Sequence, residues 1–252
     1  MLEIFILSII QGVTEFLPIS SSSHLILISN YLNFEEQSLS IDISLHVGSF
    51  LAVIFYFKKD VFNFLKNKDL FLKILISSVP VMIFGFILVQ LSLIELLRNI
   101  EVIGWSTIIF AILLYVSDKF EINKTIDNNL DYRSIIFIGI LQVLSLIPGV
   151  SRSGITISAA RILKFSRYES AKISFLLSIP TLAAVSFFGI LNLTSQNDIN
   201  FSILNLISIF LSFIFSYLTI KFFLKYIKSF SLNIFVIYRI ILGVILLSIS
   251  YL

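Results

Sequence analysis

Two polar stretches interrupt an otherwise apolar sequence, and their side chains could act on a phosphate group. The first, QGVTEFLPISSSSHL at residues 11–25, contains an amide, a carboxylate, four consecutive serines and a histidine. The second, PGVSRSGIT at 148–156, adds an arginine between two serines. Arginine presents a planar, permanently charged fork that suits phosphate, and a serine hydroxyl can act as a nucleophile. These residue types therefore favour phosphoryl chemistry.

Each candidate residue has a role that its chemistry permits. Gln11 and Glu15 are four residues apart, so they share one face of a helix, and Glu15, together with Gln11, could hold a divalent ion that neutralises phosphate charge. His24 could act as a general acid or base. The Pro-Gly pair before Ser151 and Arg152 predicts a turn into a helix N-terminus, which also suits a phosphate.

The same residues have structural interpretations. Serine-rich turns commonly satisfy backbone groups or cap helices, and Glu15 could simply be the ion-pair partner of Arg152. We interpret His46, in SLHVGS, as structural. Ionisable side chains inside membrane spans are costly, however, and indicate function by default. The combination of Glu15, His24 and Arg152 at two matched breaks therefore favours a site.

The composition indicates which elements must position these residues. Of 252 residues, 58% are hydrophobic and only 13% are charged, whereas soluble domains carry roughly 25% charged residues. We expect an all-α polytopic membrane protein that forms a single integral membrane domain over residues 1–252. The net charge of +3 comes from short basic clusters between apolar runs, so it does not indicate a nucleic-acid partner. With no cysteine, disulfides and cysteine nucleophiles are excluded.

Eight apolar runs divide the chain. Six are uninterrupted and predict transmembrane helices, at 43–57, 72–92, 102–117, 172–194, 201–220 and 232–252. The other two, 2–32 and 134–160, are broken by Pro, Ser and Gly. Lysine and arginine concentrate in the connections 58–73, 118–133, 161–172 and 221–228, and are absent from 30–42 and 192–200. The positive-inside rule places the basic connections in the cytoplasm and the other two outside.

This threading predicts two re-entrant helical hairpins. Segment 134–160 must enter and leave on the cytoplasmic face, and 2–32 enters from outside if it is also re-entrant. The halves, about 1–117 and 134–252, are then inverted-topology repeats linked by the cytoplasmic loop 118–133. Both interrupted segments contain a Gln that is followed, after apolar residues, by Pro-x-x-Ser-x-Ser, and this shared pattern supports the repeat. Pro80 and Pro180 do not follow it. Irregular backbone at membrane depth must face protein or a wet cavity, so both tips should line one site.

Both polar stretches resemble the signature motifs of the undecaprenyl-diphosphate phosphatase family, also called the bacitracin-resistance protein family. LHVGSFLAV (45–53) and SFLLSIP (174–180) are also similar to family sequence, so the resemblance spans the chain. It implies hydrolysis of undecaprenyl diphosphate, a lipid within the bilayer, to undecaprenyl phosphate and inorganic phosphate. This reaction recycles the lipid carrier for peptidoglycan synthesis and confers bacitracin resistance. The resemblance also implies six spans with two re-entrant hairpins.

The resemblance assigns further properties. It implies a divalent metal ion, Mg²⁺ or Ca²⁺, and a location in the bacterial cytoplasmic (inner) membrane, with the site opening to the periplasmic or external face. The family's acidic positions fall on Gln11 and Glu15, and Gln11, the neutral option, offers only a carbonyl oxygen. The family's serine falls on Ser21, its histidine on His24 and its arginine on Arg152, with Ser151, Ser153 and Thr156 around the arginine. We predict that Glu15, Ser21, His24 and Arg152 are catalytic. The residues predicted to bind the substrate are Ser20, Ser22, Ser151, Ser153 and Thr156. Ser23 replaces a usual glycine, at a cost if that position has positive φ.

Several alternatives stay open. Either Ser21, activated by His24, or a metal-bound water attacks the terminal phosphorus. Inverted repeats with broken helices are also transporter architecture, so the alternative is a transporter or flippase for a polyprenyl phosphate or another anion. A second class of lipid phosphatase needs a catalytic histidine after its Ser-Arg motif, and none follows His46. The sequence does not determine the isoprenoid length or the oligomeric state, and a homodimer is one of the states that stay open.

Overall fold

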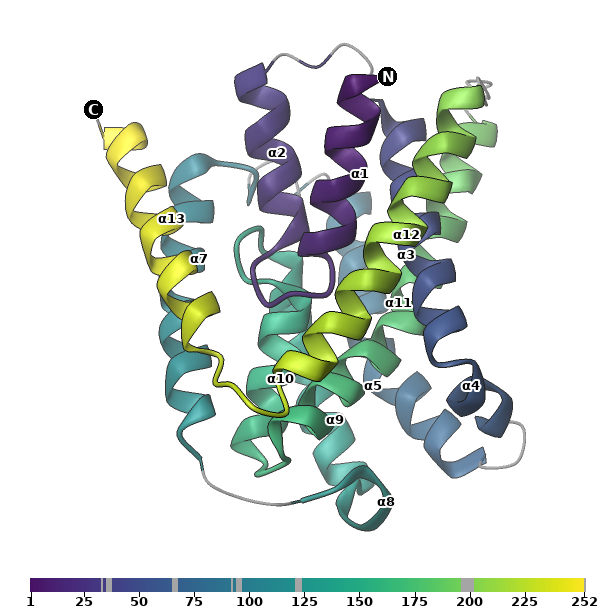
Figure 1. The fold of residues 1–252 in the computed structure, drawn as a ribbon, viewed down its shortest axis with the longest axis vertical. Helices are drawn as coiled ribbons and strands as arrows, with labels where there is room; N and C mark the ends of the chain where they lie inside the picture. The colour runs from purple at the N-terminus through teal and green to yellow at the C-terminus, as the bar shows by residue number, and fades with distance from the viewer. Residues whose placement is uncertain are drawn as a thin grey trace.

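The computed structural model describes residues 1–32, 34, 38–64, 68–91, 93, 97–120, 124–195 and 202–251, and it is built from helices (Figure 1). Six of them are long and apolar enough to cross a membrane. They are α3 (Leu39–Tyr56), α5 (Lys68–Gln90), α7 (Ile100–Asp118), α11 (Arg167–Ser195), α12 (Ile203–Tyr226) and α13 (Asn233–Tyr251). Each covers one of the six uninterrupted apolar runs, so the predicted all-α membrane protein with six spans is confirmed.

Some segments that were expected to be loops are helical. α12 continues to Tyr226 through the basic cluster at 221–228, and α11 already begins at Arg167. Two short helices, α4 (Lys58–Phe64) and α8 (Ile126–Asn129), occupy parts of other basic connections. A helix can continue through such clusters because long basic side chains extend their charged ends into water. Residues 33, 35–37, 65–67, 94–96, 121–123 and 196–200 of the predicted loops, and residues 92, 201 and 252 of the predicted spans, lie outside the described residues.

Both interrupted runs form helical hairpins. The first consists of α1 (Leu2–Thr14) and α2 (Ser21–Leu32), and the second of α9 (Tyr132–Gln142), the 3-10 turn η1 (Val143–Leu146) and α10 (Arg152–Ile162). We call residues 15–21 the first tip and residues 147–153 the second tip. Figure 1 shows the hairpins approaching from opposite ends of the molecule, with the tips near its middle. Their re-entrant placement in a bilayer stays a prediction.

The packing of the long helices follows the order of the two halves. α3 packs on α12 and α5 packs on α11, while α1 lies on α12 and α9 on α5. This pairing is the one expected of the predicted repeats, because α3 and α11 occupy equivalent places, as do α5 and α12. Small residues permit close approach: a Cβ on Gly48 would lie 2.4 Å from the carbonyl oxygen of Ile209.

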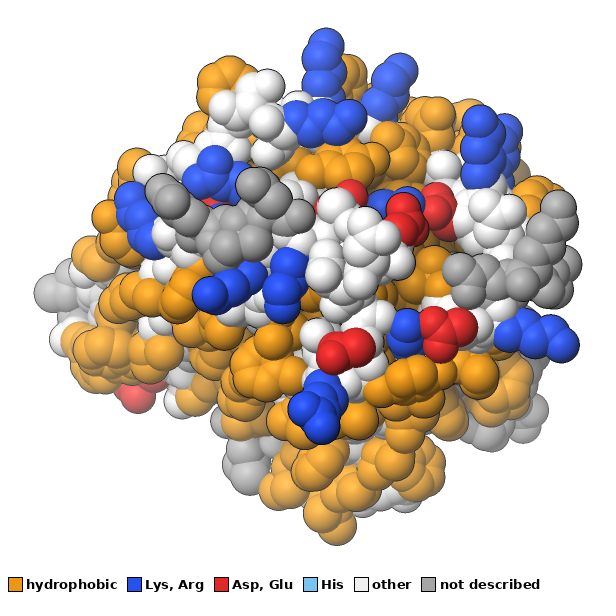
Figure 2. All heavy atoms as spheres, turned by 90° about the horizontal axis from the view of Figure 1, so that it is seen from below, with side chains coloured by type: hydrophobic (Ala, Val, Ile, Leu, Met, Phe, Trp, Pro, Cys, Tyr) orange, Lys and Arg blue, Asp and Glu red, His pale blue; other side chains and the backbone are white. Residues whose placement is uncertain are grey.

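The lower end of the molecule carries the basic residues. Figure 2 shows lysine and arginine side chains gathered around this face, as expected of the predicted cytoplasmic side. Beneath them Asp118, at the end of α7, is buried and accepts two hydrogen bonds from Arg167, at 2.6 and 2.9 Å. The same carboxylate accepts the backbone N–H of Leu232 at 3.2 Å. This network ties α7 to the start of α11 and to the segment before α13.

Candidate active site

The first tip holds Glu15 at the end of α1. The backbone N–H of Glu15 donates to the carbonyl of Gln11 at 3.0 Å, which continues the last turn of the helix. The next residue, Phe16, is fully buried, and its ring centroid lies 5.3 Å from that of Phe175 on α11 in an edge-on arrangement. This apolar anchor holds the tip in place and keeps the adjacent carboxylate buried.

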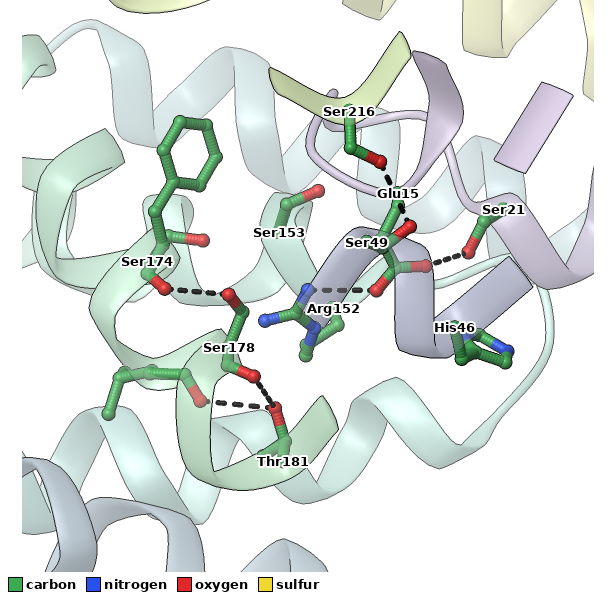
Figure 3. Close-up of polar contacts among 12 residues, drawn as sticks. Glu15, Ser21, His46, Ser49, Arg152, Ser153, Ser174, Ser178, Thr181 and Ser216 are labelled. Carbon is green, nitrogen blue, oxygen red and sulfur yellow. Dashed lines mark hydrogen bonds and ion pairs between the residues drawn. The ribbon is translucent and has the colours of Figure 1, made fainter. Parts of the chain in front are cut away.

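The carboxylate of Glu15 joins the two tips. Arg152 Nη2 donates to Oε1 at 2.9 Å, across 137 residues of sequence. Ser21 Oγ donates to Oε2 at 2.6 Å, and Figure 3 shows these two interactions from opposite sides of the carboxylate. Gln11 Nε2 donates to Oε2 at 3.1 Å. The structure therefore brings together four of the predicted site residues, Gln11, Glu15, Ser21 and Arg152.

The serines of the second tip mainly shape the turn. Ser151 Oγ accepts the backbone N–H of Gly154 at 3.1 Å, so Ser151 is the N-cap of α10. Ser153 Oγ donates to the carbonyl of Leu17 at 2.7 Å and thereby binds one tip to the other. Thr156 Oγ1 lies 2.7 Å from Ser174 Oγ on α11. All three predicted substrate-binding residues thus lie at or near the tip, and their hydroxyls already have partners in the protein.

The two tips share an uncommon backbone feature. Ser20, directly before α2, has φ +76°, and Ser151, directly before α10, has φ +70°. Few residues other than glycine adopt this region, and such conformations cluster at functional sites. The sequence pattern, counted from the prolines, pairs Ser21 with Ser151, whereas the backbone pairs Ser20 with Ser151. The first turn is therefore one residue shorter than the pattern indicates.

Ser22 and Ser23 belong to the first turn of α2. Ser23 is buried and does not have positive φ, so the condition under which a serine would be costly there is not met. The Oγ atoms of Ser23 and Ser20 lie 3.0 Å apart. The Oγ of Ser22 lies 3.4 Å from that of Ser20. These contacts stabilise the positive-φ serine that precedes the helix.

His24 makes its hydrogen bonds away from Ser21. Nδ1 lies 2.6 Å from the carbonyl oxygen of Ser20, and Nε2 lies 2.6 Å from the hydroxyl of Tyr238 on α13. A carbonyl only accepts, so Nδ1 carries a proton, and in the neutral imidazole Nε2 accepts from Tyr238. In this arrangement the group that accepts the hydrogen bond of Ser21 is Glu15, while activation of Ser21 by His24 stays a prediction.

The first tip offers oxygen ligands that suit a hard cation. Gln11 Oε1 is buried without a hydrogen-bond partner, while Gln11 Nε2 lies 3.0 Å from Nδ1 of His46. Mg²⁺ and Ca²⁺ prefer oxygen ligands, and Mg²⁺ is often held by one or two carboxylates with substrate phosphates. The part of the chain that the structure describes holds no cluster of three His, Cys, Asp or Glu side chains. Gln11 Oε1 and the Glu15 carboxylate are oxygen atoms that could hold such a cation, and the metal site at these two residues stays a prediction.

Sequence reasoning did not single out two residues of α13 that lie near the tips, and it interpreted a third residue as structural. The third, His46, lies close to the first tip, with its Nδ1 3.0 Å from Nε2 of Gln11. Tyr238 and Arg239 of α13 contact the tips and were not singled out, although an arginine inside the apolar run VIYRIILG was a detectable signal. Nη1 of Arg152, which is drawn in Figure 3, is buried without a hydrogen-bond partner.

Comparison with known proteins agrees with the resemblance seen in the motifs. The family model described as bacitracin resistance protein BacA matches residues 4–245. A relative named undecaprenyl-diphosphatase, from Pelagibacter ubique (strain HTCC1062), is 50% identical over 252 residues, which cover 99% of this chain and 98% of that protein. Another protein of that name, from Jannaschia sp. (strain CCS1), is 39% identical over 261 residues, which cover 98% of each chain.

Proposed function

The chain belongs to the bacitracin resistance protein BacA family, and from this we propose that it hydrolyses undecaprenyl diphosphate to undecaprenyl phosphate and inorganic phosphate. The reaction returns the lipid carrier to the form that peptidoglycan synthesis uses and confers bacitracin resistance. The observation that carries the proposal is the meeting of Glu15, Ser21 and Arg152 at two buried tips. A carboxylate, a hydroxyl and a guanidinium within hydrogen-bond distance form a set suited to phosphoryl transfer.

Arg152 and the start of α10 would bind the diphosphate. Nη2 of Arg152 is held by Glu15, which leaves the buried Nη1 free to bind a phosphate oxygen. The N-terminus of α10 carries partial positive charge at the same place. Both groups are held in position before substrate arrives, so they can stabilise charge on the phosphoryl group without reorganising in the transition state.

Glu15 would accept the proton of the nucleophile. Ser21 Oγ already donates to Glu15 Oε2, so attack of Oγ on the terminal phosphorus would pass its proton to this carboxylate. The phosphoanhydride bond breaks, undecaprenyl phosphate leaves with the bonding electron pair, and water then hydrolyses the phosphoserine. If water attacks directly, Glu15 takes its proton and inorganic phosphate forms in one step. A divalent ion held by Glu15 and Gln11 would neutralise phosphate charge.

An apolar groove adjoins the first tip. It has a volume of about 380 Å³ and is lined by Val13, Leu17, Phe215, Leu218, Thr219, Phe222, Phe223, Tyr226 and Phe235. Leu17 lies two residues from Glu15, and its carbonyl accepts the hydrogen bond of Ser153. We assign to this groove the part of the isoprenoid tail nearest the diphosphate, since a wall of this kind suits a hydrocarbon chain.

The proposal includes a location. Six apolar helices make the chain a multi-span membrane protein, and we place it in the bacterial cytoplasmic (inner) membrane. The end opposite the basic face would be external, and the site would open toward it. The support for this orientation is the gathering of lysine and arginine at the lower end (Figure 2).

Phosphate release from undecaprenyl diphosphate by the purified protein tests the function. We expect release with Mg²⁺ or Ca²⁺, loss of release with excess EDTA, and recovery when the metal is returned. Glu15→Ala should be inactive under all three conditions. A folded wild-type protein that releases no phosphate, where a control phosphatase does, would overturn the proposal and favour a transporter or flippase.

A further inference from the structure

α13 inserts an arginine between the two tips. Arg239 has none of its surface exposed. Its Nη1 donates to the carbonyl of Pro18 in the first tip at 3.3 Å. Its Nη2 donates to the carbonyls of Gly149 and Val150 in the second tip, at 2.8 and 3.0 Å. A single guanidinium therefore bonds to residues that are about 130 positions apart in the sequence, from a third element that belongs to neither hairpin.

The charge of Arg239 is not neutralised by a carboxylate. No ion pair joins it to an acidic side chain in the described part of the protein, and its Nε is buried without a hydrogen-bond partner. Burying a cation without an anion is expensive. Such residues within membrane helices usually serve a function, which makes a role in packing alone a poor explanation for this arginine.

The surroundings of Arg239 add to the positive potential. A Cβ placed on Gly154 would lie 2.9 Å from Arg239 Nη1, so the guanidinium lies against the first turn of α10. The N-terminus of a helix is itself partly positive. Arg152 begins the same helix and is paired with Glu15, so the helix terminus and the charge of Arg239 remain without an anion. This excess of positive charge is unfavourable in the free protein and would be relieved by an anion.

We infer that Arg239 is a positioning residue for the phosphatase reaction, an inference that rests on the proposed function. By bonding to both tips it holds Arg152 in register with Glu15. It also draws three carbonyl oxygens, which would repel a phosphate, toward its own side. No carboxylate neutralises the charge of Arg239, so this charge makes the space between the tips attractive to a diphosphate. The guanidinium itself donates its hydrogen bonds to backbone carbonyls.

The chain provides a matched control in Arg161. This arginine is also buried, and it also donates to three carbonyls, those of Phe165, Asp118 and Phe120, at 2.7, 2.9 and 2.7 Å. It lies at the basic end of the molecule, however, and within 3.5 Å of the Asp118 carboxylate. Losing Arg161 should therefore cost stability in the same way but leave the tips unaffected.

The test compares Arg239→Met, Arg239→Lys and Arg161→Met in the full-length purified protein. For each, kcat and KM for undecaprenyl diphosphate are measured per folded molecule, together with competition by inorganic pyrophosphate. We expect Arg239→Met to lower kcat about a hundredfold, as a misplacement of about 1 Å can do, and to raise the inhibition constant of pyrophosphate about tenfold. Arg239→Lys keeps the charge without the fork and should recover most pyrophosphate binding but only part of kcat. Arg161→Met should lower the unfolding temperature alone.

The outcomes separate this inference from the proposed function. If Arg239→Met and Arg161→Met share the same kcat and pyrophosphate inhibition, Arg239 is structural and the inference is wrong. If Arg239→Met does not fold, Arg239→Lys decides, and a wild-type kcat in that variant would overturn the inference. If the wild type releases no phosphate, the proposed function fails, yet calorimetric binding of pyrophosphate still tests the charge of Arg239. Equal affinity in wild type and Arg239→Met would then refute it.

Discussion

The ion pair between the tips makes Glu15→Gln the most informative single substitution. Glutamine has nearly the same shape as glutamate but carries no charge. The exchange leaves the Arg152 guanidinium, whose side chain is only 14% exposed, without its anion. Removing one partner of a buried ion pair costs about 3–5 kcal/mol, so we expect a loss of unfolding free energy in this range.

The size of this effect can be isolated with a double-mutant cycle. In Arg152→Met the carboxylate loses the arginine but keeps the hydrogen bonds from Ser21 and Gln11, so the expected loss is smaller. In the double variant neither charge remains, and we expect it to be more stable than Glu15→Gln alone. The measurement is thermal and denaturant unfolding in detergent, followed by circular dichroism. Strictly additive losses would show that the pair has no coupling energy and would refute the electrostatic reasoning.

The same variants report on catalysis. Glu15→Gln removes the group that accepts the proton from Ser21, and general-base catalysis is typically worth about 10²–10⁴-fold in rate. Phosphate release per folded molecule should therefore fall by at least about a hundredfold in the single and double variants, even where stability recovers. If Glu15→Gln retains more than about a tenth of the wild-type rate, Glu15 is neither the base nor the principal metal ligand.

Three further outcomes follow from particular contacts. Gly149→Ala should lose both stability and activity, because Gly149 has φ +96° and a Cβ there would lie 2.0 Å from a serine oxygen of α7. The control Gly85→Ala should change neither, since the nearest atom to a Cβ at Gly85 is 3.4 Å away. Unfolding and phosphate-release assays measure both effects. Asp118→Asn should lower unfolding free energy by about 3–5 kcal/mol, since two arginines lose their anion, with kcat per folded molecule preserved. Tyr238→Phe removes the donor to His24 Nε2 and should leave stability within about 1.5 kcal/mol of wild type; a change in the pH profile of kcat would show that His24 titrates during turnover.

Much of the architecture follows from local patterns in the sequence. The six spans were predicted because the hydrophobicity of about 20 consecutive residues decides whether a segment can cross a bilayer. Proline, serine and glycine marked both breaks, because they interrupt the regular backbone wherever they occur in such runs. Glu15, Ser21 and Arg152, which the structure brings together, were all singled out from the sequence. Glu15 and Arg152 are ionisable groups in apolar segments, and Ser21 was singled out through the family resemblance.

Other features depend on how distant segments meet. Ser20, rather than Ser21, matches Ser151 in backbone conformation, because the length of each turn is set by packing between the hairpins. His24 bonds to Tyr238, 214 residues away, and Arg239 bonds to both tips. Such partners depend on the rotation of α13 about its axis and on the depth of each tip. Both are determined by the packing of all the helices together, which no local stretch of sequence encodes.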